Sequence, residues 1–156
     1  MFTHLDNKGN AKIVDISKKK YTDRFAKAYG EIHVSKEIFL QLSSRKNKKG
    51  DIFAVSKIAG IMAAKNTHNL IPLCHPIKID DILINFSTDE DKKIIFASSE
   101  VKCYEKTGAE MEALTAVTIS LLTIYDMCKA VDNNMIIKNI QLVEKRGGKN
   151  LILKEI

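Results

Sequence analysis

The chain has 156 residues, of which 45% are hydrophobic and 28% are charged, a composition typical of a single soluble globular domain. Its three cysteines form no C-x-x-C pair, which argues against a disulfide framework and fits a reducing compartment. The N-terminal residues contain no apolar signal core, and polar residues interrupt the longest apolar stretch, 117–127. We therefore expect a cytoplasmic protein that does not span a membrane.

The net charge of +6 favours an anionic partner without naming one. Only three of the 25 basic residues are arginines, and the chain has no tryptophan. Surfaces that bind nucleic acid combine positive charge with arginines or exposed aromatic residues. We therefore expect a small polyanion, such as a nucleotide phosphate, and no nucleic acid. A non-catalytic module that binds nucleotides or RNA remains an alternative.

Apolar periodicity predicts an α+β domain over residues 1–156, with an antiparallel sheet and helices on one face. Small residues in the first long helix predict close packing against the sheet or a neighbouring subunit. The expected elements, in chain order, are a strand at 13–16, a strand at 28–34, a short helix capped by Ser35, a helix at 52–65, strands at 79–87 and 93–101 joined by a charged turn at 88–92, a long helix at 108–131 and a strand at 135–143.

Both prolines lie in the stretch from Leu70 to Pro76, where they flank the adjacent Cys74 and His75. Proline restricts the residue before it, so Pro76 limits His75 to a few backbone conformations. A histidine with a restricted backbone suits chemistry that requires a fixed side-chain orientation. A structural role, in which His75 only makes hydrogen bonds, is equally open. The pair could bind zinc, but no further ligands stand at a recognisable spacing. We therefore expect no metal site, and a small, buried Cys74.

The long helix is apolar nearly all round, which is typical of a buried or interface helix. Each of its charged residues has a structural interpretation. Glu110 completes a capping box with Thr107, Glu112 lies at the positive end of the helix dipole, and Asp126 forms an i, i+3 pair with Lys129. The four charged residues that stand out are Glu110, Glu112, Asp126 and Lys129. Because buried charge is costly unless it is paired, the apolar surroundings also favour a functional role.

Glu112 and Asp126 lie fourteen residues apart on this helix, roughly 21 Å at 1.5 Å per residue. That distance is too long for both ends of the helix to contact one reacting atom. If both ends are catalytic, each must meet the opposite end of a second copy. We therefore expect an oligomer with shared sites.

Two basic segments contain glycine. Lys49, Gly50 and Asp51 precede a helix N-terminus, where free N–H groups attract phosphate. The segment from Lys145 to Lys149 could enclose an anion with backbone amides and cations. A surface lysine beside an N-cap and a flexible turn are the corresponding structural interpretations.

Five segments of the chain resemble the signature blocks of the molybdenum cofactor biosynthesis protein C family, the cyclic pyranopterin monophosphate synthases. The similarity extends from His4 to the C-terminal glycines, although Asn150 and Leu151 stand where the family often has serine and glycine. The segments are Lys49 to Asp51, Leu70 to Pro76 (LIPLCHP), Lys106 to Ala116 (KTGAEMEALTA), Leu122 to Ala130 (LTIYDMCKA) and Gly147 to Lys149.

The resemblance implies a ferredoxin-like fold and a homohexamer built as a trimer of dimers, with sites at subunit boundaries. It implies a lyase that converts 3',8-cyclo-dihydro-GTP to cyclic pyranopterin monophosphate and releases pyrophosphate. No cofactor is required, and Mg²⁺ could accompany the triphosphate. The family's catalytic positions fall on Lys49, His75, Asp126 and Lys129, and its substrate contacts fall on Cys74, His75, Glu110, Met111, Glu112, Lys145 and Lys149.

The expected chemistry consists of proton transfers and stabilisation of charge at a triphosphate. We assign the general acid or base to Lys129 in a poorly solvated site beside Asp126. Lys49 and His75 would hold phosphate oxygens, and Glu112 would orient the base or the ring-opened intermediate. A zinc-dependent pterin-forming cyclohydrolase, with Cys74 and His75 as ligands, is a second alternative.

Overall fold

In the part of the chain that the structure describes, five strands form one antiparallel sheet in the order β2-β3-β1-β4-β5. The structure is a computed structural model that describes residues 3–43, 51–148 and 150–154. Its elements are β1 (Thr22–His33), α1 (Lys36–Ser43), α2 (Ile52–Lys65), α3 (Thr67–Leu70), β2 (Asp81–Asp89), β3 (Ile94–Glu105), α4 (Glu110–Cys128), β4 (Ile136–Arg146) and β5 (Ile152–Leu153).

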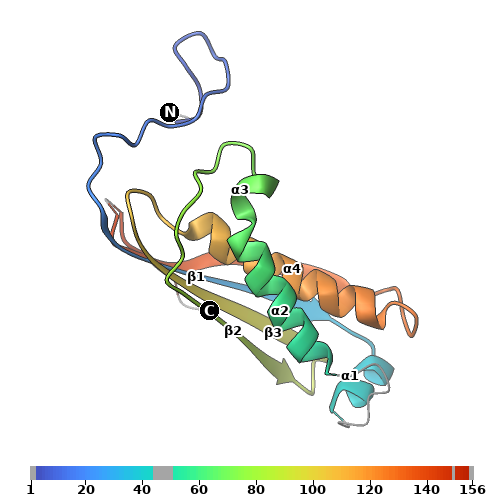
Figure 1. The fold of residues 1–156 in the computed structure, drawn as a ribbon. Helices are drawn as coiled ribbons and strands as arrows, with labels where there is room; N and C mark the ends of the chain where they lie inside the picture. The colour runs from blue at the N-terminus through green and yellow to red at the C-terminus, as the bar shows by residue number, and fades with distance from the viewer. Residues whose placement is uncertain (1–2, 44–50, 149, 155–156) are drawn as a thin grey trace.

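The two long helices, α2 and α4, lie side by side on one face of the sheet (Figure 1). The central strands β1 and β3 pair along their whole length, and β4 lies on the other side of β1. This strand order and the placement of both long helices on one face confirm the expected α+β, ferredoxin-like architecture.

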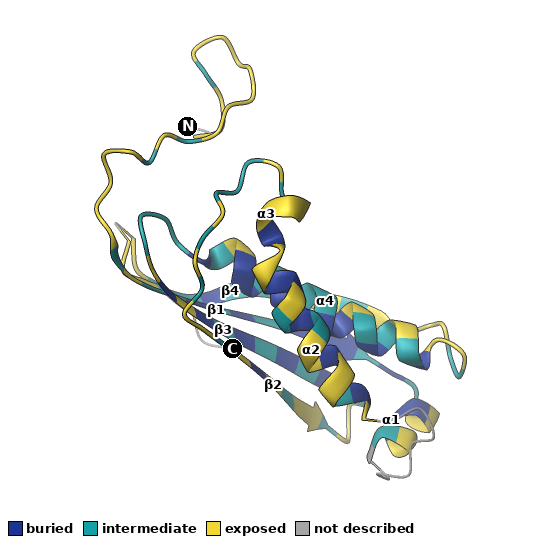
Figure 2. Cartoon of the chain, viewed as in Figure 1, coloured by how far each residue is buried: buried dark blue, intermediate teal, exposed yellow. Residues whose placement is uncertain are grey.

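The core lies between the sheet and α4, whose facing residues are buried (Figure 2). In this core, small strand residues pack with large helix residues. Ala26 and Ala28 of β1 are fully buried, as are Val117 and Leu121 of α4. A side chain added at Gly30 would collide with Val117 and Leu121. The small residues of β1 therefore allow α4 to approach the middle of the sheet closely.

Small residues also bring α2 close to α4. A side chain added at Gly60 would collide with Ser120 and with the carbonyl oxygen of Ala116. Ser120 Oγ donates a hydrogen bond of 3.1 Å to the Ser56 carbonyl oxygen. The expected close packing of the first long helix is therefore made against α4 of the same chain, and also against the sheet residue Ile84.

Among the described helices, only α4 is long enough and apolar enough to cross a membrane. It packs against β1, β3, β4 and α2, and residues such as Ala113, Ala116 and Ile124 are fully buried. The apolar composition of α4 is therefore typical of a helix in the core of a folded domain. The cytoplasmic location stays a prediction.

Two local predictions are wrong. Residues 13–16 are not a strand, because no described strand pairs with them and they extend outside the sheet. The capping box is also absent: α4 begins at Glu110 after Ala109, and this N-cap residue makes no side-chain hydrogen bond to the helix. The other elements form where expected, although β1 begins earlier and β4 ends later because each pairs along its length with its neighbour.

Candidate functional site

An ion pair joins the first turn of α4 to the end of β4. Lys145 Nζ contacts Glu110 Oε1, and about a quarter of each side chain is exposed. Lys145 is the register partner of Ala26, a fully buried residue of the helix-covered side of the sheet. The Glu110 carboxylate also lies against Gly108. Glu110 therefore binds a lysine from another strand, in place of the capping interaction expected from sequence.

Glu112 is a buried carboxyl group in the same helical turn, with only 4% of the residue exposed. Its pKa is raised from 4.5 to about 7, mainly by burial and in smaller part by the charge of the neighbouring Glu110, while a hydrogen bond to its own backbone opposes the rise. A carboxyl group with a pKa near neutrality can both accept and donate a proton at working pH. These properties are suited to general acid–base catalysis.

The loop that carries Cys74 and His75 passes beside this turn. The Cys74 N–H donates a hydrogen bond of 3.1 Å to the Ile71 carbonyl oxygen, and the Lys78 N–H donates one of 3.2 Å to Glu105 Oε1. Burial and the negative charge of Glu112 raise the pKa of the half-buried Cys74 thiol. The fold therefore brings together four residues predicted from the sequence at one end of the domain: Cys74, Glu110, Glu112 and Lys145.

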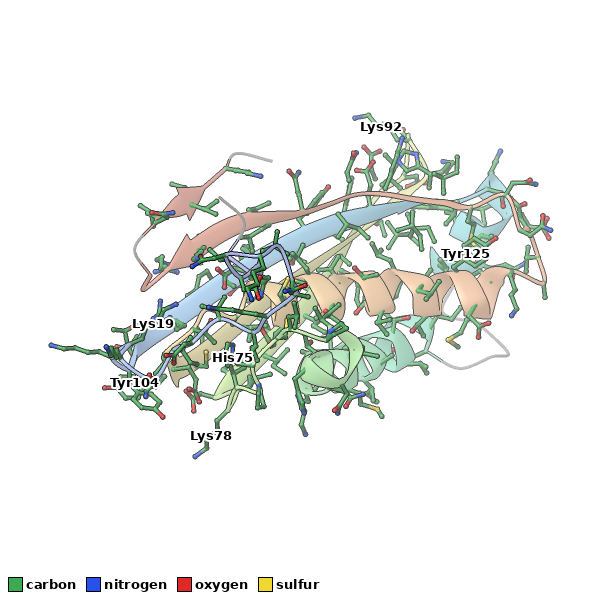
Figure 3. All side chains as sticks on the ribbon, turned by 90° about the horizontal axis from the view of Figure 1, so that it is seen from above. Lys19, His75, Lys78, Lys92, Tyr104 and Tyr125 are labelled. Carbon is green, nitrogen blue, oxygen red and sulfur yellow. The ribbon has the colours of Figure 1, made fainter. Side chains whose placement is uncertain are left out.

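His75 lies at this same end of the molecule. Figure 3 shows it near the start of α4, on the side of Tyr104 and Lys19, while Tyr125 lies toward the opposite end of the helix. The His75 side chain is half-buried. Met111, in the first turn of α4, is exposed enough to contact a ligand.

Two further residues of this end were not predicted from sequence. Arg24 donates hydrogen bonds to the carbonyl oxygens of Glu105 at 3.1 Å and Lys106 at 3.2 Å, and so fixes the turn that leads into α4. Cys103 is buried, and burial raises its pKa to about 12, with Glu105 and Glu112 adding to the rise. Arg24 could have been noticed in the sequence because it is one of only three arginines among 25 basic residues. A cysteine in a buried strand has no pattern that would mark it as part of a site.

Arg24 and Cys103 also line a cleft of about 420 Å³ at this end of the sheet. The cleft combines cationic, acidic and aromatic side chains, a mixture suited to a polar, charged ligand. Its lining residues are Asp23, Arg24, Phe25, Asp80, Lys102, Cys103 and Arg146.

The glycine pair near the C-terminus is held against β1. Gly147 has a φ of +87°, and a side chain there would collide with the carbonyl oxygen of Asp23. Thr22 Oγ1 donates a hydrogen bond of 2.9 Å to the Gly147 carbonyl oxygen. The pair is therefore a fixed turn that leads directly from Lys145 and Arg146, and glycine is required at Gly147.

Asp126 and Lys129 lie at the other end of α4. Lys129 Nζ is 2.6 Å from Asp126 Oδ1, and 59% and 67% of the two side chains are exposed. The hydrogen bond that Lys129 donates to the Asp126 carboxylate, together with the negative charge of Asp126, raises the pKa of Lys129. The single chain therefore does not bring this pair to Glu112, and it does not provide the poorly solvated surroundings expected for Lys129.

Two predicted site residues, Lys49 and Lys149, lie outside the described residues. Over 3–43, 51–148 and 150–154, no group of three His, Cys, Asp or Glu side chains is placed to hold a metal ion.

Comparison with known proteins agrees with the resemblance of the motifs. Residues 13–148 match the model of the MoaC family. The chain is 52% identical over 148 residues to a cyclic pyranopterin monophosphate synthase of Clostridium perfringens, covering 95% of this chain and 94% of the relative. A synthase of the same name from Heliobacterium modesticaldum is 49% identical, with 95% of this chain and 93% of the relative covered.

Another related protein is much longer than this chain. The molybdenum cofactor biosynthesis protein moc-5 of Caenorhabditis elegans is 50% identical over 149 residues, which cover 96% of this chain and 25% of the relative. The family model and the relatives together cover nearly the whole sequence. They confirm the family resemblance that the sequence motifs indicate. The chain belongs to the MoaC family.

Proposed function

We propose that the protein converts 3',8-cyclo-dihydro-GTP to cyclic pyranopterin monophosphate and releases pyrophosphate, as a step of molybdenum cofactor biosynthesis. The observation that carries this proposal is the buried carboxyl of Glu112, with a pKa near 7, beside the Glu110–Lys145 ion pair. This group can exchange protons at neutral pH, and the lysine supplies positive charge for a phosphorylated substrate. The names of the relatives support the same activity.

The reaction requires a cyclic phosphate to be closed at the expense of the triphosphate. A substrate hydroxyl oxygen forms a bond to the α-phosphorus and loses its proton to a base, while the bond from this phosphorus to the bridging oxygen breaks and pyrophosphate leaves. Glu112 would move protons during ring opening and pterin formation. Lys145, with Lys49 and His75, would hold phosphate oxygens and stabilise the leaving pyrophosphate.

The second half of the site would come from another copy of the chain. Asp126 and Lys129 are exposed at the far end of α4, so they are accessible to the Glu112 end of a neighbour. Burial between two copies would supply the poorly solvated surroundings that Lys129 lacks in one chain. A homohexamer built as a trimer of dimers, as the resemblance implies, fits this arrangement.

The site would bind a small nucleotide-derived substrate without a resident metal ion. Any Mg²⁺ would enter bound to the triphosphate, where it would neutralise phosphate charge. The carboxyl groups of Glu110 and Glu112 and the thiol of Cys74 would then not act as metal ligands. Cys74 has a raised pKa and remains a neutral thiol at physiological pH.

Turnover of the purified protein tests the proposal. The protein is incubated with 3',8-cyclo-dihydro-GTP, and the pterin product and pyrophosphate are measured together. We expect equal amounts of both, and a loss of both in Glu112→Gln. A wild-type protein that is folded and oligomeric but forms neither product would contradict the proposed function.

A further inference from the structure

Residues 3–16 form an arm that projects from the start of β1 and stands clear of the sheet and helices (Figures 1 and 2). All are exposed except the half-buried Asp6, Val14 and Ile16. In the described structure, the hydrogen bonds of the arm run only within residues 3–19. The outer part of the arm, residues 3–13, is therefore not packed on the domain to which it belongs.

The tip of the arm nevertheless has a defined shape. Asp6 Oδ1 accepts hydrogen bonds of 2.8 Å from the N–H groups of Lys8 and Asn10, and Gly9 closes the turn with a φ of +82°. Leu5 and Ala11 form an antiparallel bridge across the turn. The tip is thus formed in advance of any contact with another molecule.

The root of the arm is fixed at the site end of the domain. Lys106 Nζ donates a hydrogen bond of 3.1 Å to the Ser17 carbonyl oxygen and lies over the ring of Tyr21. Tyr21 in turn stacks on Tyr104, with ring centroids 5.8 Å apart. These contacts determine the direction in which the arm leaves the sheet.

A hairpin of this size is only marginally stable alone in water, because it buries little apolar surface against the entropy of ordering its chain. The arm also exposes two large apolar side chains, with 45% of Leu5 and 48% of Ile13 accessible. A preformed tip with exposed apolar residues and no contact with its own domain is suited to insertion into another molecule.

We propose that the arm of one copy seats in a groove of a second copy, beside β2. This groove has a volume of about 390 Å³ and is lined by Ile61, Lys65, Ile77, Ile79, Asp80, Asp81 and Ile82. Its four isoleucines offer apolar contacts to Leu5 and Ile13. The arm carries Lys8 and Lys12, and Asp80 and Asp81 at the groove have the opposite charge.

A second copy is the occupant that the geometry favours. The root contacts hold the arm away from its own domain (Figure 1), so the groove of the same chain stays open. Reciprocal exchange would fill two grooves with two arms in a self-complementary pair. The inference stands on these contacts and not on the proposed reaction, and its test does not use turnover.

Photochemical cross-linking of the full chain tests the contact. Benzoylphenylalanine replaces Leu5 in one variant and the exposed Leu40 of α1, at the other end of the sheet, in a control. Irradiation should give covalent dimers on a denaturing gel for the Leu5 variant, with cross-linked peptides from residues 61–82. Links within one chain, dimers no more abundant than in the control, or links to another surface of the second copy would overturn the proposal.

Self-association provides an independent measurement. Leu5→Asp combined with Ile13→Asp should weaken association at least tenfold in sedimentation experiments, whereas Leu40→Asp should not, with circular dichroism showing that all variants fold. Unchanged association of the folded double variant would also contradict the contact.

Discussion

Glu110 of α4 is paired with Lys145 of β4, so a carboxylate that sequence alone assigns to helix capping links two elements at the candidate site. We predict that Lys145→Ala lowers turnover by roughly 10²-fold, because it removes a cation that, in the proposed function, would hold the substrate phosphates. The exposed Lys138→Ala, on the same strand, is the matched control. Since the pair is partly exposed, the free energy of unfolding should change by less than about 1 kcal/mol. Equal activity of the two variants would remove Lys145 from the site.

Glu112 should make the stability of the domain depend on pH. Its pKa is raised in the folded chain, from 4.5 to about 7, so folding binds a proton between these values. Below about pH 4.5 the group is neutral in both states, and as the pH rises toward 7 the folded state loses stability, by at most about 3 kcal/mol.

Glu112→Gln should remove this dependence. The variant should therefore be more stable than the wild type at pH 8 and nearly equal to it at pH 4.5, as measured by urea unfolding at both values. A wild type with the same stability as the variant at pH 8 would show that Glu112 is ionised in the folded protein without cost.

Gly147 is expected to be intolerant of substitution. Gly147→Ala places a Cβ against the Asp23 carbonyl oxygen in a backbone with positive φ, so it should destabilise the domain by about 2–4 kcal/mol. Gly9→Ala is the control, since Gly9 also has positive φ but has open space around it and lies in the N-terminal arm, away from the packed domain, so it should change the stability of the domain by less than about 0.5 kcal/mol. Thermal unfolding of the two variants measures the difference, and equal losses would mean that the contact with Asp23 is unimportant.

The fold could be predicted from sequence because its signals are local. Small residues in α2, the Ser35 cap and the apolar pattern of β3 each identified an element, and Ser35 Oγ does accept a hydrogen bond from the Ile38 N–H at 3.3 Å. The predicted strand at residues 13–16 was wrong although their apolar pattern matches that of a strand. A strand must also pair with a neighbouring strand, and the local pattern does not encode that neighbour.

The site was predicted less completely, because its contacts are made between distant segments. The motifs identified Glu110, Glu112 and Lys145, but not that Glu110 binds Lys145. Arg24 was missed since its role consists of hydrogen bonds to backbone carbonyl oxygens about 80 residues away, which leave no pattern in the sequence.

Asp126 should matter for activity and not for stability. The exposed pair with Lys129 contributes little to folding, so Asp126→Asn should change the free energy of unfolding by less than about 0.5 kcal/mol. If the pair acts in the site of a neighbouring copy, the same variant should lose turnover by roughly 10²-fold. Normal turnover of a folded Asp126→Asn oligomer would exclude the pair from the site.

Mixed oligomers test most directly that the reaction takes place at a site shared between copies. Glu112→Gln and Asp126→Asn are co-expressed at equal levels with different tags, the mixed oligomers are isolated, and turnover of 3',8-cyclo-dihydro-GTP is measured. If Glu112 and Asp126 come from different copies, about a quarter of the sites will hold both native residues, and activity will return to about that share of the wild type. If each site lies within one chain, every chain carries a lesion, and the mixture will be as inactive as either variant alone.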